Sequence, residues 1–336
     1  MSGALSRGAS SGSLSPAPAS PVFVCDLFDV APKDDLASME HPIFSLATRP
    51  DRSILSYVHN GVEVEVTPSV KGRATIHDKD ILIYCISQLM AALNAGREVS
   101  RVLHLRAHDL LVGTGRDTSG DAYRRLREAF ERLAGTRITT NIAIGAFETT
   151  SGFGLIESWE IVRRSRGGRM VQVVVTLSEW LFRAVEARAV LTLAPGYFDL
   201  RRPLERRIYE LCRKHCGRQP EWRVSLATLQ KKSGSASPRR VFRAMLRDII
   251  SRGRLPEYDL ALEEGDVLAV TPRRAPAPAD APRPSESALE EARAMLPGAD
   301  VHALVAQWQG WWARSGRARI GNADKAFLGW CRTRRG

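Results

Sequence analysis

The amino-acid sequence predicts a mixed α+β fold in which one supersecondary unit occurs twice. In each copy an apolar helix leads into a short strand, a short helix and a longer helix rich in arginine, and further strands follow. This is the order of a winged helix-turn-helix, whose recognition helix enters a DNA groove and whose hairpin forms the wing. We therefore expect two tandem winged helix-turn-helix domains, with a disordered N-terminal arm before them and a small helical C-terminal segment after them.

The overall composition narrows the range of partners. A net charge of +12 over 336 residues indicates a polyanionic partner, either nucleic acid or an acidic membrane surface. The sequence has no apolar run long enough to span a bilayer, and residues 1–20 lack the apolar stretch of a signal peptide. We therefore expect a cytoplasmic protein with no membrane partner.

Composition also divides the chain into five predicted parts. Residues 1–40 carry a net charge of −3 and start with a Ser/Pro/Ala-rich stretch, which is typical of a disordered arm. Residues 41–180 and 181–272 are the two predicted winged-helix domains, and together they hold 36 basic and 26 acidic side chains, a net of +10. Residues 273–285 read as an extended Pro/Ala-rich linker, and residues 286–336 contain four of the seven tryptophans.

The first domain is predicted to begin with an apolar helix at residues 78–94. A strand at 101–105 and a short helix ending at Gly113 come next, and a glycine-containing turn leads to a helix that Thr118 and Asp121 cap. The apolar residues of that helix fall on one face, so its arginines point away from the core. After Gly135 the alternation TRITTNIAI predicts a strand of the wing, and two more strands follow. The turn between these last two strands is also basic, as expected of a wing tip. The arginines concerned are Arg124, Arg125 and Arg127 in the helix, and Arg163, Arg164, Arg166 and Arg169 in the turn.

The second domain repeats the pattern. A helix at residues 201–216 is followed by a strand and by a short helix that Gly234 ends. The next helix starts with Ser237 as its N-cap and Pro238 at its first position. Its buried stripe leaves the arginines outside, and two lysines end the helix before it. The basic residues concerned are Lys231, Lys232, Arg239, Arg240, Arg243 and Arg247.

Arginine suits a recognition helix because its planar fork can bind phosphate oxygens or the O6/N7 edge of guanine in the major groove. The alternative is that these charged faces are merely solvated, which is the usual fate of charged helix faces. Two arginine helices with matching flanks favour binding to double-stranded DNA.

Three blocks of this sequence resemble a known family. They read HPIFSLATRPD from residue 41, AYRRLREAFERLAGTRITTNI from 122 and YFDLRRPLERRIYELCRKHCG from 197. They are similar to the replication initiator protein A family of bacterial plasmids, and the resemblance covers about residues 41–272. It implies tandem winged-helix domains that bind repeated origin sites (iterons), open the adjacent duplex, recruit host helicase or initiator proteins and serve copy control. It also implies binding as a monomer, with homodimers held off the DNA.

Two other function classes remain alternatives. A transcriptional regulator could use the same two domains on an operator. A nicking replication enzyme needs two histidines that flank one apolar residue, whereas His104 and His108 lie four positions apart. The segment GTGRDTSG from Gly113 lacks the Lys-Ser/Thr ending of a phosphate loop. We therefore expect no catalysis.

Metal and cofactor sites are not predicted either. The five cysteines are scattered and odd in number, which favours reduced thiols over a disulfide framework. The CRKHC cluster at 212–216 lacks the second ligand pair that a structural zinc site needs.

The C-terminal segment has two readings. Its tryptophans fall mainly on one helical face, which predicts the core of a helical hairpin. Aromatic and basic residues together could also stack on single-stranded DNA or contact the helicase machinery. The residues concerned are Trp308, Trp311, Trp312 and Trp330.

Overall fold

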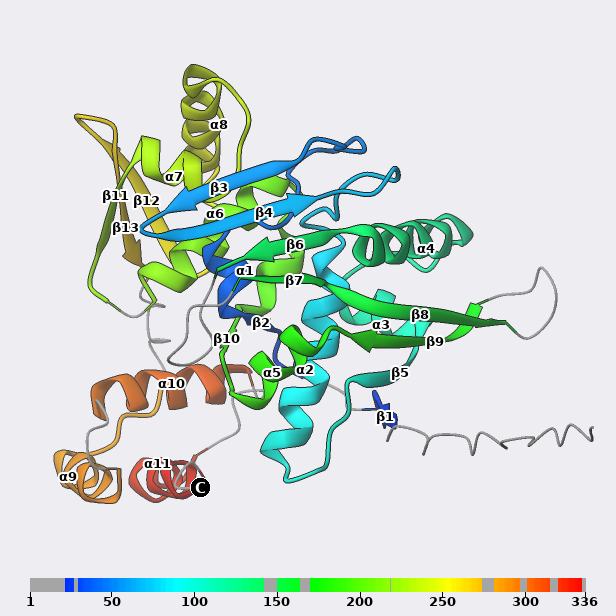
Figure 1. Cartoon of the computed structure of the whole chain (residues 1–336). Coiled ribbons are helices and arrows are strands. Elements are labelled where there is room, and N and C mark those ends of the chain that lie inside the picture. Colours follow the sequence, from blue (N-terminus) through cyan, green and yellow to red (C-terminus); the bar gives the residue numbers. More distant parts are fainter. Residues whose placement is uncertain are drawn as a thin grey trace, which may run out of the picture. The chain divides into compact units, whose positions relative to one another are not determined.

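The computed structural model describes residues 22–26, 30–141, 150–163, 170–217, 219–273, 281–296, 301–314 and 320–333. The chain divides into two compact units, Met1–Pro272 and Arg273–Gly336. The first unit is a mixed α+β structure with several small sheets (Figure 1). Within the described residues, no helix is both long and apolar enough to cross a membrane.

The first half of unit 1 has the predicted order of helix, strand, helix, helix and hairpin. Strand β5 pairs antiparallel with β9, and β9 pairs antiparallel with β8, so the hairpin and the early strand share one sheet. Helix α2 runs through the middle of the unit and is buried along most of its length (Figure 1). The elements are α2 (Lys79–Asn94), β5 (Val102–Arg106), α3 (Ala107–Gly113), α4 (Gly120–Gly135), β8 (Ile156–Arg163) and β9 (Met170–Leu177).

The second half of unit 1 repeats this order with the same strand pairing. The early strand β11 pairs antiparallel with β13, which also pairs with β12, giving a three-stranded sheet. Figure 1 shows α8 and α4 projecting from different sides of the unit. The elements are α6 (Pro203–His215), β11 (Trp222–Ser225), α7 (Leu226–Ser233), α8 (Arg239–Arg252), β12 (Tyr258–Glu263) and β13 (Val267–Pro272).

A separate four-stranded sheet corrects one expectation. The alternating segment behind α4 was expected to belong to the wing, but its strand β6 pairs with β4 and β7 instead. Strands β3 and β4 form a hairpin whose turn, Asn60–Gly61, has positive φ angles of 51° and 79°. This is the two-residue turn that matches the twist of paired strands. The sheet consists of β3 (Leu55–His59), β4 (Val62–Thr67), β6 (Arg137–Thr140) and β7 (Ser151–Gly154).

The two arginine helices, α4 and α8, each begin one residue later than the sequence predicted. In α4 the N-cap is Ser119, whose hydroxyl accepts from the Ala122 amide at 3.3 Å, and not Thr118. Helix α8 begins at Arg239, and extended Pro238 takes the cap position expected of Ser237. In α4 the hydroxyls of Thr118 and Ser119 offer the same capping chemistry, so the choice between them depends on backbone angles that the sequence does not give.

The prediction of a disordered arm is wrong for Lys33–Glu40. These residues form β2 and α1, and the Asp35 carboxylate caps α1 by accepting from the Ser38 amide at 2.8 Å. Within this segment Asp34 is buried against Lys79 of α2, and the half-buried Glu40 pairs with Lys214 of α6 and Lys232 of α7. The remaining elements of unit 1 are β1 (Val22–Val24), β2 (Lys33–Asp35), α1 (Leu36–Glu40), α5 (Glu179–Glu186), β10 (Val190–Thr192) and the 3-10 helix η1 (Pro195–Asp199).

Buried ion pairs join the two halves of unit 1. Lys79 of α2 lies 2.5 Å from the Asp34 carboxylate and 3.0 Å from that of Glu210 in α6. Next to it, Arg206 of α6 pairs with Asp80 of α2. Burial opposes a charge on Lys79, but the Asp34 and Glu210 carboxylates raise its pKa above the ordinary value. Removing one partner would leave a buried charge without compensation, so this network fixes α2 against α6.

Unit 2 is a small three-helix cluster around tryptophan. Trp308 is fully buried and lies 5.5 Å from the Phe327 ring, measured between ring centroids. Ser285 caps the first helix and also donates to Asp324 at 2.7 Å, which ties that helix to the last one. The helices are α9 (Glu286–Met295), α10 (Val301–Arg314) and α11 (Ala323–Arg332).

Candidate nucleic-acid interface

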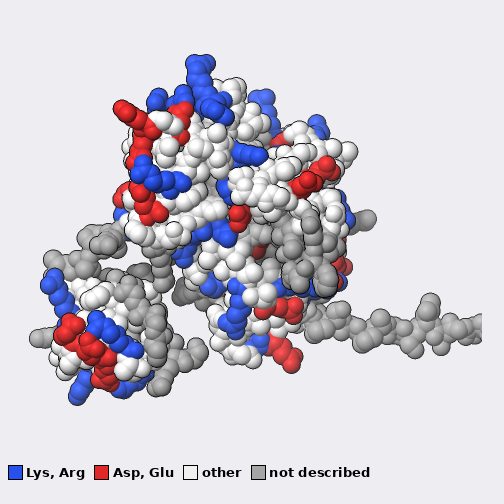
Figure 2. All heavy atoms as spheres, turned by 60° about the vertical axis from the view of Figure 1, so that its left-hand side comes forward, with Lys and Arg blue, Asp and Glu red and all other residues white. Residues whose placement is uncertain are grey.

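Helix α8 presents a face of arginines without internal partners. Phe242, Leu246 and Ile249 are buried at helical spacing, which turns the arginines outward. We call Arg239, Arg240 and Arg247 the α8 basic face. All three are exposed, and within the described residues their guanidinium groups form no hydrogen bond or ion pair. Figure 2 shows Lys and Arg gathered at the top of the molecule, where α8 lies.

Two other basic residues predicted to bind DNA have internal partners. Arg243 donates from Nε to Asp266 at 2.9 Å, and so links α8 to the turn between β12 and β13. Lys232 has only 8% of its side chain exposed and lies 3.2 Å from the Glu40 carboxylate of α1. A lysine buried in this way does not reach a duplex, so we do not assign Lys232 to the interface. Lys231 is exposed at the end of α7.

Helix α4 also exposes its predicted arginines, but each one is paired with a carboxylate. Arg124 has 61% of its side chain exposed, pairs with Asp121 and lies 2.6 Å from Glu128. Arg125 lies 3.0 Å from Asp117 in the preceding turn and also pairs with Asp121.

The third pair on this helix joins Arg127 to Glu131 at 3.3 Å. We call these residues the α4 charge ladder: Arg124, Arg125, Arg127, Asp117, Asp121, Glu128 and Glu131. The hydrogen bonds from Arg124 lower the pKa of Asp121 below its ordinary value, with the charges of Arg124 and Arg125 acting in the same direction. Asp121 is therefore ionised at neutral pH.

The predicted basic wing tip falls mostly outside the described residues. Arg163 ends β8, while its side chain and residues Arg164, Arg166 and Arg169 are not among those described. Their contact with DNA stays a prediction. The second hairpin has an acidic turn, Glu264–Gly265–Asp266, whose Asp266 holds Arg243. In the sequence, the turn between β8 and β9 is therefore basic, whereas that between β12 and β13 is acidic.

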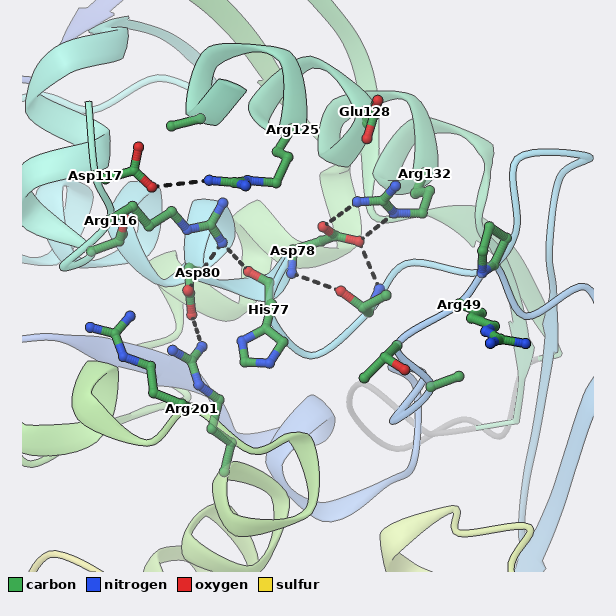
Figure 3. A pocket seen from close by; sticks show the side chains of 17 residues that line it. Arg49, His77, Asp78, Asp80, Arg116, Asp117, Arg125, Glu128, Arg132 and Arg201 are labelled. Atoms are coloured by element: carbon green, nitrogen blue, oxygen red, sulfur yellow. Dashed lines mark hydrogen bonds and ion pairs between the residues drawn. The ribbon is translucent and has the colours of Figure 1, made fainter. Parts of the chain in front are cut away.

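A cavity of about 580 Å³ lies beside α4 and is lined by residues from α2, α4 and the start of α6 (Figure 3). Its charged side chains are largely paired with one another. Arg132 of α4 donates to Asp78 at 2.7 and 2.8 Å, and Arg116 donates to Asp80 at 3.1 Å. Burial and the nearby charge of Arg206 together lower the pKa of His77 to about 4, so this histidine is neutral at pH 7. These pairs hold α4 against α2.

Histidines and cysteines take structural positions. His104 accepts or donates at 2.7 Å with Gln172 on the neighbouring strand, and His215 stacks on Trp222 at 4.9 Å between ring centroids. Cys212 and Cys216 are buried. In the part of the chain that the structure describes, no three His, Cys, Asp or Glu side chains gather as metal ligands would.

The tryptophans of unit 2 do not share one environment. Trp308, Trp312 and Trp330 are buried, as expected of a helical core. Trp311 has 47% of its surface exposed. Among the described residues of unit 2, Trp311 is therefore the one of these four tryptophans that a DNA single strand or a protein partner could contact.

Comparisons with known proteins identify the family. A family model described as Replication initiator protein A matches residues 33–260. The chain is 37% identical over 231 residues to a protein of Wigglesworthia glossinidia brevipalpis described as a "putative replication protein", which covers 68% of this chain and 84% of that relative.

Domains 2 and 3 of RctB, solved by crystallography, match with a TM-score of 0.55 at 14% identity, over 70% of this chain and 98% of that chain. At this identity the match shows a shared fold. Because the family model spans residues 33–260, about two thirds of the sequence, the chain belongs to the replication initiator protein A family.

Proposed function

We propose that this chain initiates plasmid replication by binding repeated sites (iterons) in duplex origin DNA through two winged helix-turn-helix domains. It then promotes opening of the adjacent duplex and recruits host replication proteins, and it has no catalytic activity of its own. The observation that carries the proposal is the α8 basic face, which projects from the recognition-helix position of a unit that occurs twice. Membership of an initiator family supplies the biological setting.

The two halves of unit 1 are suited to bind DNA as one rigid body. The buried contacts of Lys79 and Arg206 fix α2 against α6, and each of these helices opens one copy of the repeated order of elements in unit 1. Recognition helices one DNA turn apart would lie about 34 Å from each other, a span that two joined domains can bridge. One chain therefore covers about two turns of duplex without a second copy, and homodimers form off the DNA.

Contacts that recognise the base sequence and contacts that position the protein on the DNA are assigned to different residues. Arg240 and Arg124 are the candidates for contacts with guanine edges, and the wing arginines are candidates for phosphate contacts. Arg243 positions the second hairpin through Asp266. Trp311 is the candidate for stacking on the opened strand or for contact with the helicase machinery.

Binding and replication need to be measured separately. The purified chain is titrated against DNA from beside its own gene that contains direct repeats, and against a shuffled duplex of equal length. The same repeats are placed on a plasmid whose maintenance depends on the chain. The proposal expects preference for the repeats together with plasmid maintenance.

Repression of a reporter by the bound chain without maintenance would instead support the alternative of a transcriptional regulator. Equal affinity for both duplexes would contradict sequence-specific binding altogether.

A further inference from the structure

The two arginine helices differ in their counter-charges. The α8 basic face has no carboxylate partner among the described residues. The acid on that helix, Asp248, turns to Arg202 and Arg252 instead. On α4, by contrast, every arginine of the α4 charge ladder lies against at least one carboxylate.

Two features of the ladder favour these pairs. The contacts of Arg124 with Glu128, of Arg125 with Asp121 and of Arg127 with Glu131 join residues four apart, the spacing at which helical side chains meet. Asp117 is itself held in place, because its carboxylate accepts from the Ser119 amide at 3.0 Å. The fold of the helix and of the turn before it therefore places the carboxylates beside the arginines.

A carboxylate next to an arginine affects two DNA contacts unequally. A phosphate carries a negative charge, so the neighbouring carboxylate repels it and competes with it for the same N–H donors. The edge of guanine is neutral and needs only two of the five N–H donors of the fork, which leaves the others for the carboxylate. The acid therefore weakens phosphate binding while it orients the fork for a base.

We propose that the carboxylates of the α4 charge ladder make α4 a specificity filter: they suppress its binding to phosphate and hold its arginines ready for guanine edges. The α8 basic face then supplies most of the sequence-independent affinity, and α4 supplies most of the discrimination. This inference rests on the proposed function, because it assumes that both helices face the same duplex.

Removing the charge of a carboxylate without changing its shape tests the filter. Glu128→Gln is the main variant, because Glu128 lies in the middle of α4 and caps nothing; Asp121→Asn is the second. The matched control is Glu179→Gln, which breaks an exposed pair of the same four-residue spacing with Arg183 on α5. Thermal unfolding of each variant verifies that α4 remains folded.

The readout is affinity for a random-sequence duplex and for origin repeats, each at several salt concentrations. Each ladder variant should bind random DNA about 3 to 10 times more tightly than the wild type, within the range of single exposed charges. Its slope of log K against log salt should steepen by about 1, since the variant raises the net positive charge of the ladder by one. The ratio of the affinity for origin repeats to the affinity for random DNA should fall. Glu179→Gln should change neither the affinities nor the salt slope.

The two proposals fail in different ways. If the wild type prefers the repeats but Glu128→Gln and Asp121→Asn behave like Glu179→Gln, the filter is overturned and the initiator function stands. Weaker binding of a folded ladder variant to random DNA would also overturn the filter. If the wild type does not bind duplex DNA, the proposed function fails first and the filter fails with it.

Discussion

The double substitution Arg240→Ala/Arg247→Ala should remove half of the sequence-independent attraction to DNA that the residues on and beside α8 contribute. Four exposed basic side chains near the second recognition helix have no partner within the described residues: Lys231, Arg239, Arg240 and Arg247. If each neutralises one phosphate, these residues contribute about −3.6 to the slope of log K against log salt in the wild type and about −1.8 in the double variant. Through this contribution alone, raising the salt from 50 to 200 mM weakens wild-type binding about 150-fold but the variant only about 12-fold.

The assay is a fluorescence anisotropy titration of a labelled random-sequence duplex across that range of salt. Arg183→Ala is the matched control, because it removes one exposed arginine that is already paired, on a helix outside both arginine helices. A double variant that keeps the wild-type slope would refute the assignment of phosphate binding to α8. So would a loss as large in the control.

Three further predictions concern stability and domain division. Gly234→Ala should destabilise the chain by about 1–3 kcal/mol more than Gly253→Ala. Both glycines have a positive φ angle, so that strain is common to the two substitutions. A Cβ at Gly234 would in addition lie 2.7 Å from Pro42, whereas a Cβ at Gly253 would meet nothing within 4 Å. Urea unfolding measures the difference, and equal losses would contradict the contact. Stability should also fall as the pH drops from 6.5 to 4, because burial lowers the pKa of His41, His77 and His215 in the folded chain to about 4. The unfolded chain therefore takes up protons at a higher pH than the folded chain, which costs on the order of 1–2 kcal/mol of stability per histidine at pH 5. A melting temperature that is flat across this window would contradict their burial as neutral groups. Finally, truncation after residue 272 should leave duplex affinity nearly unchanged and abolish plasmid maintenance; a collapse of affinity would show that unit 2 belongs to the DNA-binding core.

The sequence predicted the helices of both repeated units well because their apolar residues recur at helical spacing. The family resemblance that it suggested is confirmed. The β3–β4 hairpin was missed, although Asn60–Gly61 between alternating apolar residues is a strong local signal for a hairpin. The partner of β6 could not be read in this way, since β4 lies about 70 residues earlier and strand pairing over such distances leaves no local pattern.

Charge pairing shows the same division between local and distant contacts. The pair of Arg124 with Glu128 follows from their spacing on a helix and could have been predicted from the sequence. The partners of Arg243 and Lys232 come from a distant turn and from the N-terminal segment, so periodicity could not reveal them. For the same reason, the acidic residues before residue 41 suggested a solvated arm instead of buried partners.

The central claim is that one chain reads one repeat of duplex origin DNA with both arginine helices. Nuclease protection on a fragment that carries the direct repeats, at known ratios of chain to site, tests it most directly. The account predicts protection of roughly two helical turns for each bound chain, and loss of most of the preference for repeats over shuffled DNA in Arg124→Ala. Protection that needs two chains on an inverted repeat, or a preference for repeats that Arg124→Ala leaves intact, would contradict it.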